Sequence, residues 1–196
     1  MDFELTDEQR LLCDSVASFV KKDSPIERFR KQRDVEPGYS KKTWAQMGEL
    51  GWLGLPLPEA AGGLGGAFID AALVLERFGT TLVPEPYIPS VLLGGMAVAK
   101  AGNAAQQDGV LSPMIAGKTT LALAYAERES RHDVTQVQTR AEKKGSGYVL
   151  RGEKQWVLSG DSADHLIVSA RTAGSSAEAR GISLFVVPGD AKKLER

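Results

Sequence analysis

The stretch Ala116-Gly117-Lys118-Thr119-Thr120-Leu121-Ala122-Leu123-Ala124-Tyr125 separates two regions of different character. Before it, apolar residues recur at the three- and four-residue spacing of amphipathic helices. After Lys118, short runs rich in β-branched residues alternate with turn-forming residues, as in strands. The sequence therefore predicts an α+β protein, with an N-terminal all-α helical domain at residues 1–117 and a small antiparallel β-barrel or sandwich domain at residues 118–196.

Capping signals divide the first region into helices. Thr6-Asp7-Glu8-Gln9 is a capping box, which predicts the start of an amphipathic helix that runs to Lys21-Lys22. Ser40 and Gly51 are suited to be the N-cap and the left-handed C-terminal cap of a second helix. Residues 67–78 are apolar nearly all round, which is typical of a buried central helix. Further helices are predicted over residues 91–102 and 104–111.

Short segments of the second region are typical of strands, and Gly145-Ser146-Gly147 and residues 171–181 are typical of the connections between them. Their regular spacing indicates a small sandwich or barrel. The predicted strands cover residues 119–125, 137–141, 148–150, 155–158, 166–170 and 182–187.

The composition excludes several classes of protein. The 196 residues carry a formal net charge of −1, which argues against electrostatic binding of nucleic acid or of an anionic membrane. No apolar run approaches the roughly 18 residues of a membrane span. Cys13 is the only cysteine, so it is expected to be a packed thiol in the first helix, with no disulfide or thiolate zinc cage within the chain. A cytoplasmic protein is expected.

The usual signatures of catalytic and metal sites do not occur. His132 and His165 have no cysteine or carboxylate cluster at ligand spacing, so no metal site is expected. No nucleophile-elbow pattern is present. The run Gly62-Gly63-Leu64-Gly65-Gly66 lacks both a preceding strand and the Lys-Ser/Thr pair of a phosphate loop, and a bend between packed helices is expected there.

Several short motifs follow one another along the whole chain, beginning with the capping box and ending with the last predicted strand. They are Leu5-Thr6-Asp7-Glu8-Gln9, Glu49-Leu50-Gly51-Trp52-Leu53-Gly54-Leu55-Pro56, Gly62-Gly63-Leu64-Gly65-Gly66, Leu75-Glu76-Arg77-Phe78-Gly79, Tyr148-Val149-Leu150-Arg151-Gly152-Glu153-Lys154-Gln155-Trp156 and Ser183-Leu184-Phe185-Val186-Val187-Pro188. On these motifs taken jointly, the chain resembles the acyl-CoA dehydrogenase family. Within that family, residues 124–131 and 160–164 look closest to the small subunit of pimeloyl-CoA-type dehydrogenases.

The resemblance implies a flavoprotein oxidoreductase of fatty acid metabolism. Members of the family bind FAD between the β domain and a C-terminal helical bundle, and remove the α and β hydrogens of an acyl-CoA thioester. A carboxylate takes the α proton, and the flavin accepts the β hydride, because side chains cannot accept a hydride. The residues implied at the flavin edge are Tyr125, Ala126, Glu127, His132, Trp156, Val157 and Leu158.

Two segments depart from the family pattern. The first flavin segment usually reads Val-Thr-Glu-Pro-Gly-Ala-Gly-Ser-Asp, and at residues 125–133 Ala126 replaces the Thr and His132 the Ser. The second usually reads Trp-Ile-Thr, and here Trp156 is retained while Leu158 replaces the Thr. Backbone amides at Ala126 and Leu158 remain as donors, and a lost hydroxyl bond costs about 0.5–1.5 kcal/mol. Weakened or altered flavin binding is expected.

The chain stops at Arg196, before the bundle that supplies the catalytic carboxylate in this family, so no catalytic residue is assigned. Glu127 and Asp133 are expected to be solvated turn carboxylates rather than bases.

The leading hypothesis is the N-terminal and middle domains of an FAD-dependent acyl-CoA dehydrogenase that acts with an acyl-CoA substrate and an electron-transfer acceptor. By itself the chain is expected to be inactive. A missing C-terminal domain, or another acyl-CoA dehydrogenase subunit in a homo- or hetero-oligomer, would complete it. One alternative is a non-catalytic assembly subunit of a heteromeric acyl-CoA dehydrogenase with a degenerate flavin site, and another is a ligand-free structural module.

Overall fold

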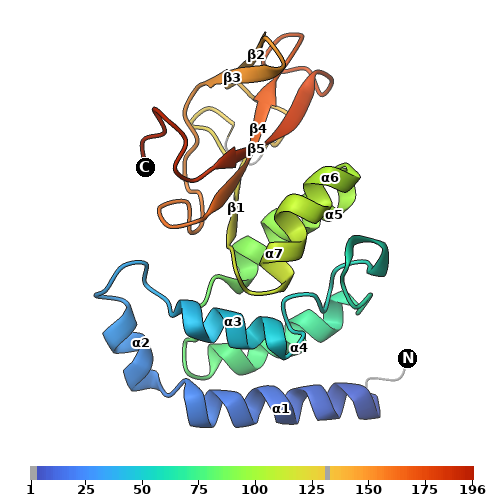
Figure 1. The fold of residues 1–196 in the computed structure, drawn as a ribbon, viewed down its shortest axis with the longest axis vertical. Helices are drawn as coiled ribbons and strands as arrows, with labels where there is room; N and C mark the ends of the chain where they lie inside the picture. Colours follow the sequence, from blue (N-terminus) through green and yellow to red (C-terminus); the bar gives the residue numbers. More distant parts are fainter. Residues whose placement is uncertain (1–3, 131–132) are drawn as a thin grey trace.

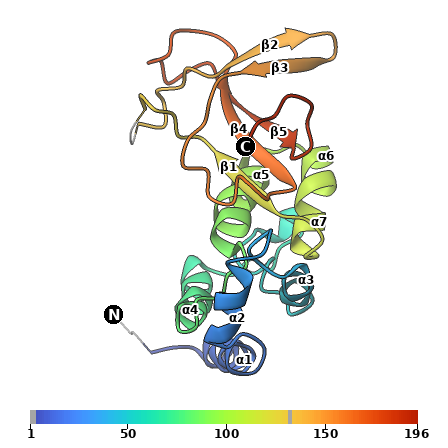
Figure 2. The same cartoon turned by 90° about the vertical axis from the view of Figure 1, so that its left-hand side faces the viewer.

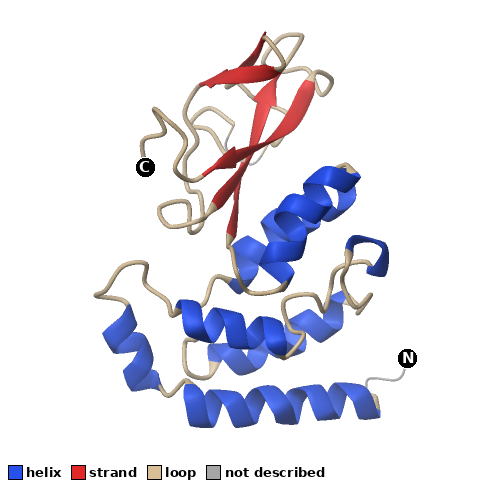
Figure 3. Ribbon diagram, viewed as in Figure 1, coloured by secondary structure: helices blue, strands red, loops and turns tan. Residues whose placement is uncertain are grey.

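In the computed structural model, which describes residues 4–130 and 133–196, a layer of helices lies beneath a five-stranded sheet (Figure 1). The helices come first along the chain and the strands last, so the two kinds of structure are separated in space as well as in sequence (Figure 3). The α+β class is confirmed. The helical elements are α1 (Asp7–Asp23), α2 (Ile26–Gln32), α3 (Lys41–Glu49), η1 (Glu59–Ala61), α4 (Phe68–Gly79), η2 (Ile88–Gly95), α5 (Met96–Ala101), α6 (Ala104–Gln106), η3 (Gln107–Leu111) and α7 (Ser112–Ile115).

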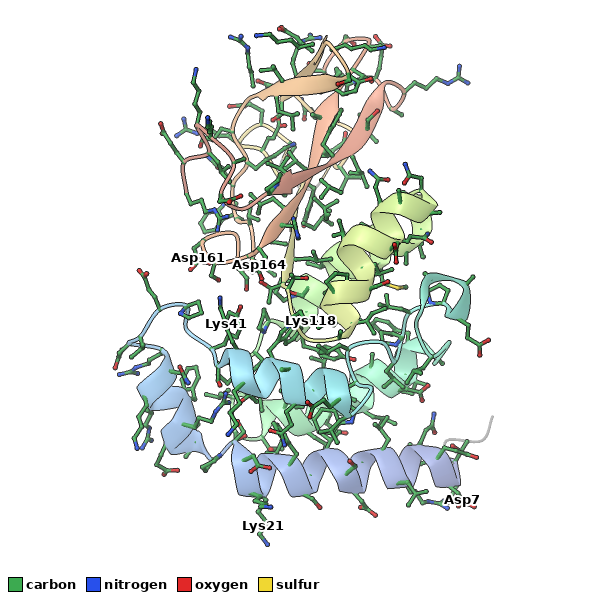
Figure 4. All side chains as sticks on the ribbon, in the orientation of Figure 1. Asp7, Lys21, Lys41, Lys118, Asp161 and Asp164 are labelled. Atoms are coloured by element: carbon green, nitrogen blue, oxygen red, sulfur yellow. The ribbon has the colours of Figure 1, made fainter. Side chains whose placement is uncertain are left out.

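The predicted helix signals act as expected. The Thr6 hydroxyl accepts from the Gln9 N–H at 3.2 Å and the Gln9 side chain accepts from the Thr6 N–H at 3.1 Å, which confirms the capping box of α1. Asp7 and Lys21 lie at the two ends of α1 (Figure 4), each with the sign of charge that the helix dipole favours. At the end of α3, Gly51 adopts φ +78° and its N–H donates to Gly48 O at 2.9 Å, which confirms its left-handed cap.

Two features of the helical layer differ from the prediction. Helix α2 was not predicted, because it buries no residue and therefore has no apolar stripe to detect. Helix α4 is not buried all round: Phe68 is 73% and Ile69 51% exposed. Only one face of α4 packs into the core, through Val74 and Phe78 among others, so an apolar composition alone did not indicate the orientation of its first turn.

The glycine run forms the expected bend. Gly65 N–H donates to Leu57 O and Gly66 N–H to Leu55 O, both at 2.8 Å, so residues 62–66 fold back on the preceding segment. A Cβ on Gly66 would lie 2.7 Å from Leu55 O, so a larger residue at this position would force the backbone to shift.

The sheet has the order β1-β4-β2-β3, with β5 also paired to β4. Its strands are β1 (Leu121–Ala124), β2 (Arg140–Lys144), β3 (Gly147–Arg151), β4 (His165–Arg171) and β5 (Ile182–Pro188). The expectation of a purely antiparallel sheet is wrong: β1 and β4 pair in parallel, and so do β2 and β4 at Arg140 and Arg171. The long connection from β1 to β4 contains the β2–β3 hairpin and returns the chain in its original direction, as parallel pairing requires. Figure 2 shows this hairpin at the end of the sheet far from α1.

The predicted strand at residues 155–158 does not form. Trp156 adopts φ +56°, a left-handed conformation that no strand contains, and the segment lies in the loop between β3 and β4.

Strand β1 connects the two layers. Leu121 and Ile167 belong to the main core with the helices, whereas Ala122 and Leu166 belong to a second cluster on the opposite face of the sheet. This alternation follows from the two-residue period of a strand. On the helix side, the Ser90 hydroxyl donates to Leu121 O at 2.9 Å and accepts from Leu121 N–H at 3.0 Å, so η2 satisfies both backbone groups of Leu121 at the edge of β1 that does not pair with β4.

Across residues 4–130 and 133–196, no helix has the length and apolar character needed to cross a membrane.

Substituting the glycine at the helix–sheet junction is expected to destabilise the protein. Gly117 adopts φ +67°, and a Cβ there would lie 2.6 Å from Ala45 Cα and 2.7 Å from Trp44 O. Gly117→Ala should therefore lower the free energy of unfolding by about 2 kcal/mol or more in urea titration of the full-length protein.

Gly109→Ala is the matched control, because a Cβ at Gly109 in η3 would meet nothing within 4 Å. That variant should unfold at the wild-type urea concentration or slightly above it. Equal effects of the two substitutions would contradict the packing described for Gly117.

Candidate functional site

Two segments far apart in the sequence lie side by side beyond the end of β1. The Gln155 N–H donates to Ala126 O at 2.9 Å, which joins residues 125–127 to the loop between β3 and β4. Of the seven residues implied by the family resemblance, six lie in these two segments, and His132 lies outside the described residues.

An ion pair beneath these segments fixes their spacing. Lys154 Nζ lies 2.6 Å from Glu127 Oε1, and both side chains are buried. The same carboxylate accepts from the N–H groups of Gln138 at 2.6 Å and of Thr139 at 3.0 Å. The expectation that Glu127 is solvated is therefore wrong, because three donors hold its oxygens inside the protein.

The environment keeps this pair charged. Burial raises the pKa of the Glu127 carboxyl, but hydrogen bonds from Lys154 and from the backbone outweigh that effect, so its pKa lies below the usual 4.5. Burial lowers the pKa of the Lys154 ammonium, and its hydrogen bond to Glu127 opposes that shift. A carboxylate that is ionised at neutral pH and already occupied by three donors has a structural role and is unsuited to be a general base.

Asp133 is exposed, as expected. Its carboxylate accepts from the Thr135 N–H at 2.9 Å and from the Thr135 hydroxyl at 2.7 Å, which lowers the pKa of the acid and closes a local turn. This carboxylate is used within its own loop.

The surface above the ion pair is apolar and open. Trp156 is 90% and Leu158 56% exposed, and Tyr125 is also exposed, whereas Val157 between them packs against the second core cluster. Trp156 at φ +56° and Ser159 at φ +55° are left-handed non-glycine residues in the same loop. Strain of this kind is concentrated at sites where a loop must present a side chain in one direction.

Backbone donors accompany the exposed ring. Within residues 4–130 and 133–196, the N–H groups of Ala126 and Leu158 have no acceptor. An aromatic face next to free amide donors matches a flat ring system that carries carbonyl and ring-nitrogen acceptors. An isoalloxazine has this chemistry, so the residues present fit a flavin.

Residues that the sequence did not reveal support the site from below. Arg171, buried at the end of β4, donates to backbone carbonyl oxygens of two loops, and the Arg171 N–H donates to Thr139 O at 2.7 Å. Arg171 thereby fixes the loop whose Gln138 and Thr139 N–H groups donate to the Glu127 carboxylate. The carbonyls that accept from its guanidinium are those of Val137 at 2.9 Å, Arg180 at 2.9 Å, Thr135, Ser176 and Glu178 at 3.0 Å, and Ala173 at 3.5 Å.

The loop after Trp156 returns to the base of β1. Asp164 Oδ2 accepts from the Thr120 N–H at 2.8 Å and from its hydroxyl at 3.0 Å. Figure 4 shows Asp161 and Asp164 on the side of the sheet that faces the helices, near Lys118. The loop is therefore tied on both sides of β1, to Thr120 just before the strand and to Ala126 just after it. In the part of the chain that the structure describes, no cluster of three or more His, Cys, Asp or Glu residues is arranged to hold a metal ion.

Comparison with known proteins identifies the family. Residues 6–118 match the N-terminal domain and residues 122–196 the middle domain of acyl-CoA dehydrogenases. The chain is 34% identical over 201 residues to isovaleryl-CoA dehydrogenase of Pongo abelii, covering 98% of this chain and 48% of that protein. It is 33% identical over 196 residues to the probable acyl-CoA dehydrogenase YngJ of Bacillus subtilis, covering 99% and 51%.

Solved structures agree. A probable acyl-CoA dehydrogenase from Mycobacterium abscessus superimposes with a TM-score of 0.84 at 28% identity, covering 95% of this chain and 50% of that one. A chain of the ChsE4–ChsE5 complex from Mycobacterium tuberculosis gives a TM-score of 0.82 at 26% identity, covering 98% and 50%. The chain thus spans about half the length of the relatives it matches, and over that half it belongs to the acyl-CoA dehydrogenase family.

Proposed function

We propose that the chain forms the helical and flavin-facing part of an FAD-dependent acyl-CoA dehydrogenase, which removes the α and β hydrogens of an acyl-CoA thioester. The observation that carries the proposal is the pairing of the Ala126 segment with the exposed Trp156 loop. In this proposal, residues 1–117 and 118–196 are the N-terminal and middle domains. The likeness to the small subunit of pimeloyl-CoA-type dehydrogenases is part of the same proposal.

FAD, when bound, supplies the hydride acceptor, and this chain supplies the surface that binds and orients it. Trp156 would pack against the ring, and the Ala126 and Leu158 amides would donate to acceptors at its edge. Tyr125 and Leu158 exclude water from one side of the ring. His132, which the family resemblance implies at the flavin edge, is included in this proposal and lies outside the described residues.

The catalytic carboxylate is proposed to come from outside these segments. Glu127 is occupied by Lys154 and two backbone amides, and Asp133 by Thr135, so neither offers a free base. We therefore assign the base, the rest of the acyl-CoA site and the contacts with an electron-transfer acceptor to the remaining half of the enzyme or to a partner subunit.

Trp156→Ala should weaken FAD binding without destabilising the fold. Aromatic stacking contributes about 1–3 kcal/mol, so the dissociation constant for FAD should rise about fivefold or more. Because the Trp156 side chain is almost fully exposed, the free energy of unfolding of the flavin-free protein should change by less than about 0.5 kcal/mol. Flavin fluorescence titration and urea unfolding of the full-length protein measure the two quantities.

Leu11→Ala provides the control, since Leu11 is an exposed apolar residue on α1 in the helical layer. It should leave the affinity for FAD unchanged. Unaltered affinity in Trp156→Ala would remove Trp156 from the flavin site.

A second candidate is a non-catalytic subunit that supports assembly with another acyl-CoA dehydrogenase chain. Two observations favour it: Ala126 and Leu158 have no hydroxyl where the family pattern has threonine, and the ChsE4–ChsE5 complex, by its name an assembly of two proteins, is among the similar structures.

Native mass spectrometry of the protein purified from its own source separates the two candidates, because one spectrum reports chain length, partner mass and bound flavin. An oligomer that carries one FAD for each copy of this chain is expected. A hetero-oligomer in which only the partner chains carry FAD, or in which no chain carries FAD, would favour the assembly role.

A further inference from the structure

We propose that Lys154 is a positioning residue that sets the geometry of the flavin-facing surface, an inference that rests on the proposed function. Its ammonium group reaches three acceptors on two segments: Glu127 Oε1 at 2.6 Å and Tyr125 O at 3.3 Å on the first flavin segment, and Ser169 Oγ at 2.9 Å on β4. The side chain is only 8% exposed. All three N–H donors of the ammonium group therefore have a protein partner.

Lys154 and its neighbour together hold three successive residues of the first flavin segment. Lys154 bonds to Tyr125 and Glu127, and the Gln155 N–H bonds to the carbonyl of the residue between them, Ala126. Trp156 follows directly in the chain. The spacing between the Ala126 amide and the Trp156 ring, which are the two groups proposed to contact the flavin, is therefore set by the bonds of Lys154 together with the bond between Gln155 and Ala126.

The acceptors of Lys154 are themselves fixed. Glu127 is held by the amides of Gln138 and Thr139, and Ser169 is a buried residue of β4, which pairs with strands on both sides. Without the ammonium group, Glu127 would keep a buried negative charge with no cation beside it, which is strongly unfavourable. The first segment would shift to hydrate that charge, and Ala126 would move away from Trp156.

A second ion pair, between the partly buried Arg28 and the buried Glu85, offers a matched control. Arg28 donates through Nη1 to Glu85 Oε2 at 3.0 Å and to Ser24 Oγ at 3.0 Å, and through Nη2 to Thr43 Oγ1 at 3.0 Å. This pair joins α2 and α3 to the segment before η2, within the helical layer. Both pairs support the fold, but only Lys154 bonds to the segments proposed to hold the flavin.

The experiment compares Lys154→Met, Lys154→Arg and Arg28→Met in the full-length protein, with its partner subunit where it has one. FAD affinity, the visible absorption spectrum of the bound flavin and the urea midpoint are measured for each. Lys154→Met should weaken FAD binding about tenfold or more and alter the flavin spectrum. Lys154→Arg, which keeps the charge and the donors, should recover part of the affinity, and Arg28→Met should lower the urea midpoint while leaving FAD affinity within about twofold of wild type.

The alternative outcomes are distinct. Wild-type affinity and spectrum in Lys154→Met, or an equal loss of affinity in Arg28→Met, would overturn the role of Lys154 and leave the proposed function standing. Wild-type protein that binds no FAD would overturn both. If Lys154→Met does not fold, Ser169→Ala removes one acceptor only, and the same two measurements decide: about a twofold or greater loss of FAD affinity supports the role, and wild-type affinity contradicts it.

Discussion

The structure depends on how the short strand β1 is held. One of its edges pairs in parallel with β4, and at the other edge the Ser90 hydroxyl of η2 bonds both backbone polar groups of Leu121. A Cβ on Gly94 would lie 2.7 Å from the Leu121 side chain, so η2 and β1 can approach this closely only because that residue is glycine. The helices and the sheet share a core at this strand, and the first flavin segment begins one residue beyond its end. The contacts of β1 with β4 and η2 therefore set the orientation of the site relative to the helical layer, and none of these contacts involves a site residue.

Buried charge replaces regular secondary structure where the site is built. Residues 125–139 and 152–164 contain no strand ladder in their described part, and they are held by Lys154 with Glu127 and by the carbonyl partners of Arg171. Burying such groups is unfavourable unless every donor and acceptor is used, and here the donors of Lys154 are all used. Polar networks of this kind specify one loop conformation, because each alternative conformation leaves a charge unpaired. That specificity is what a surface for a rigid planar cofactor requires.

The helices could be predicted because their signals are local. The capping box at Thr6 and the left-handed Gly51 act within a few residues of themselves, and both are present in the structure. The parallel pairing of β1 with β4 joins residues 44 positions apart, as in Leu121 with His165, and no local pattern contains it. A strand is predicted at Trp156 because three apolar residues follow one another there, although the conformation of this loop is set by bonds to Ala126 and Glu127. The supporting role of Lys154 could have been suspected only from its place two residues before the tryptophan.

The absent hydroxyls at Ala126 and Leu158 bear less on flavin binding than their place in the motif suggests. A side-chain hydroxyl contributes one hydrogen bond, of about 0.5–1.5 kcal/mol net, while the backbone N–H at the same position does not depend on the side chain. Both of those amides remain without an acceptor in the described part of the chain, and Leu158 adds apolar area beside Trp156. Covering that apolar area with a flat ring would remove it from water, which stabilises by roughly 25 cal/mol per Å². A leucine in place of threonine therefore loses one directional hydrogen bond and gains buried apolar surface. In the proposed site, affinity would then rest chiefly on the backbone and the tryptophan, and the absent hydroxyls would alter the hydrogen bonding that tunes the electronic properties of the flavin.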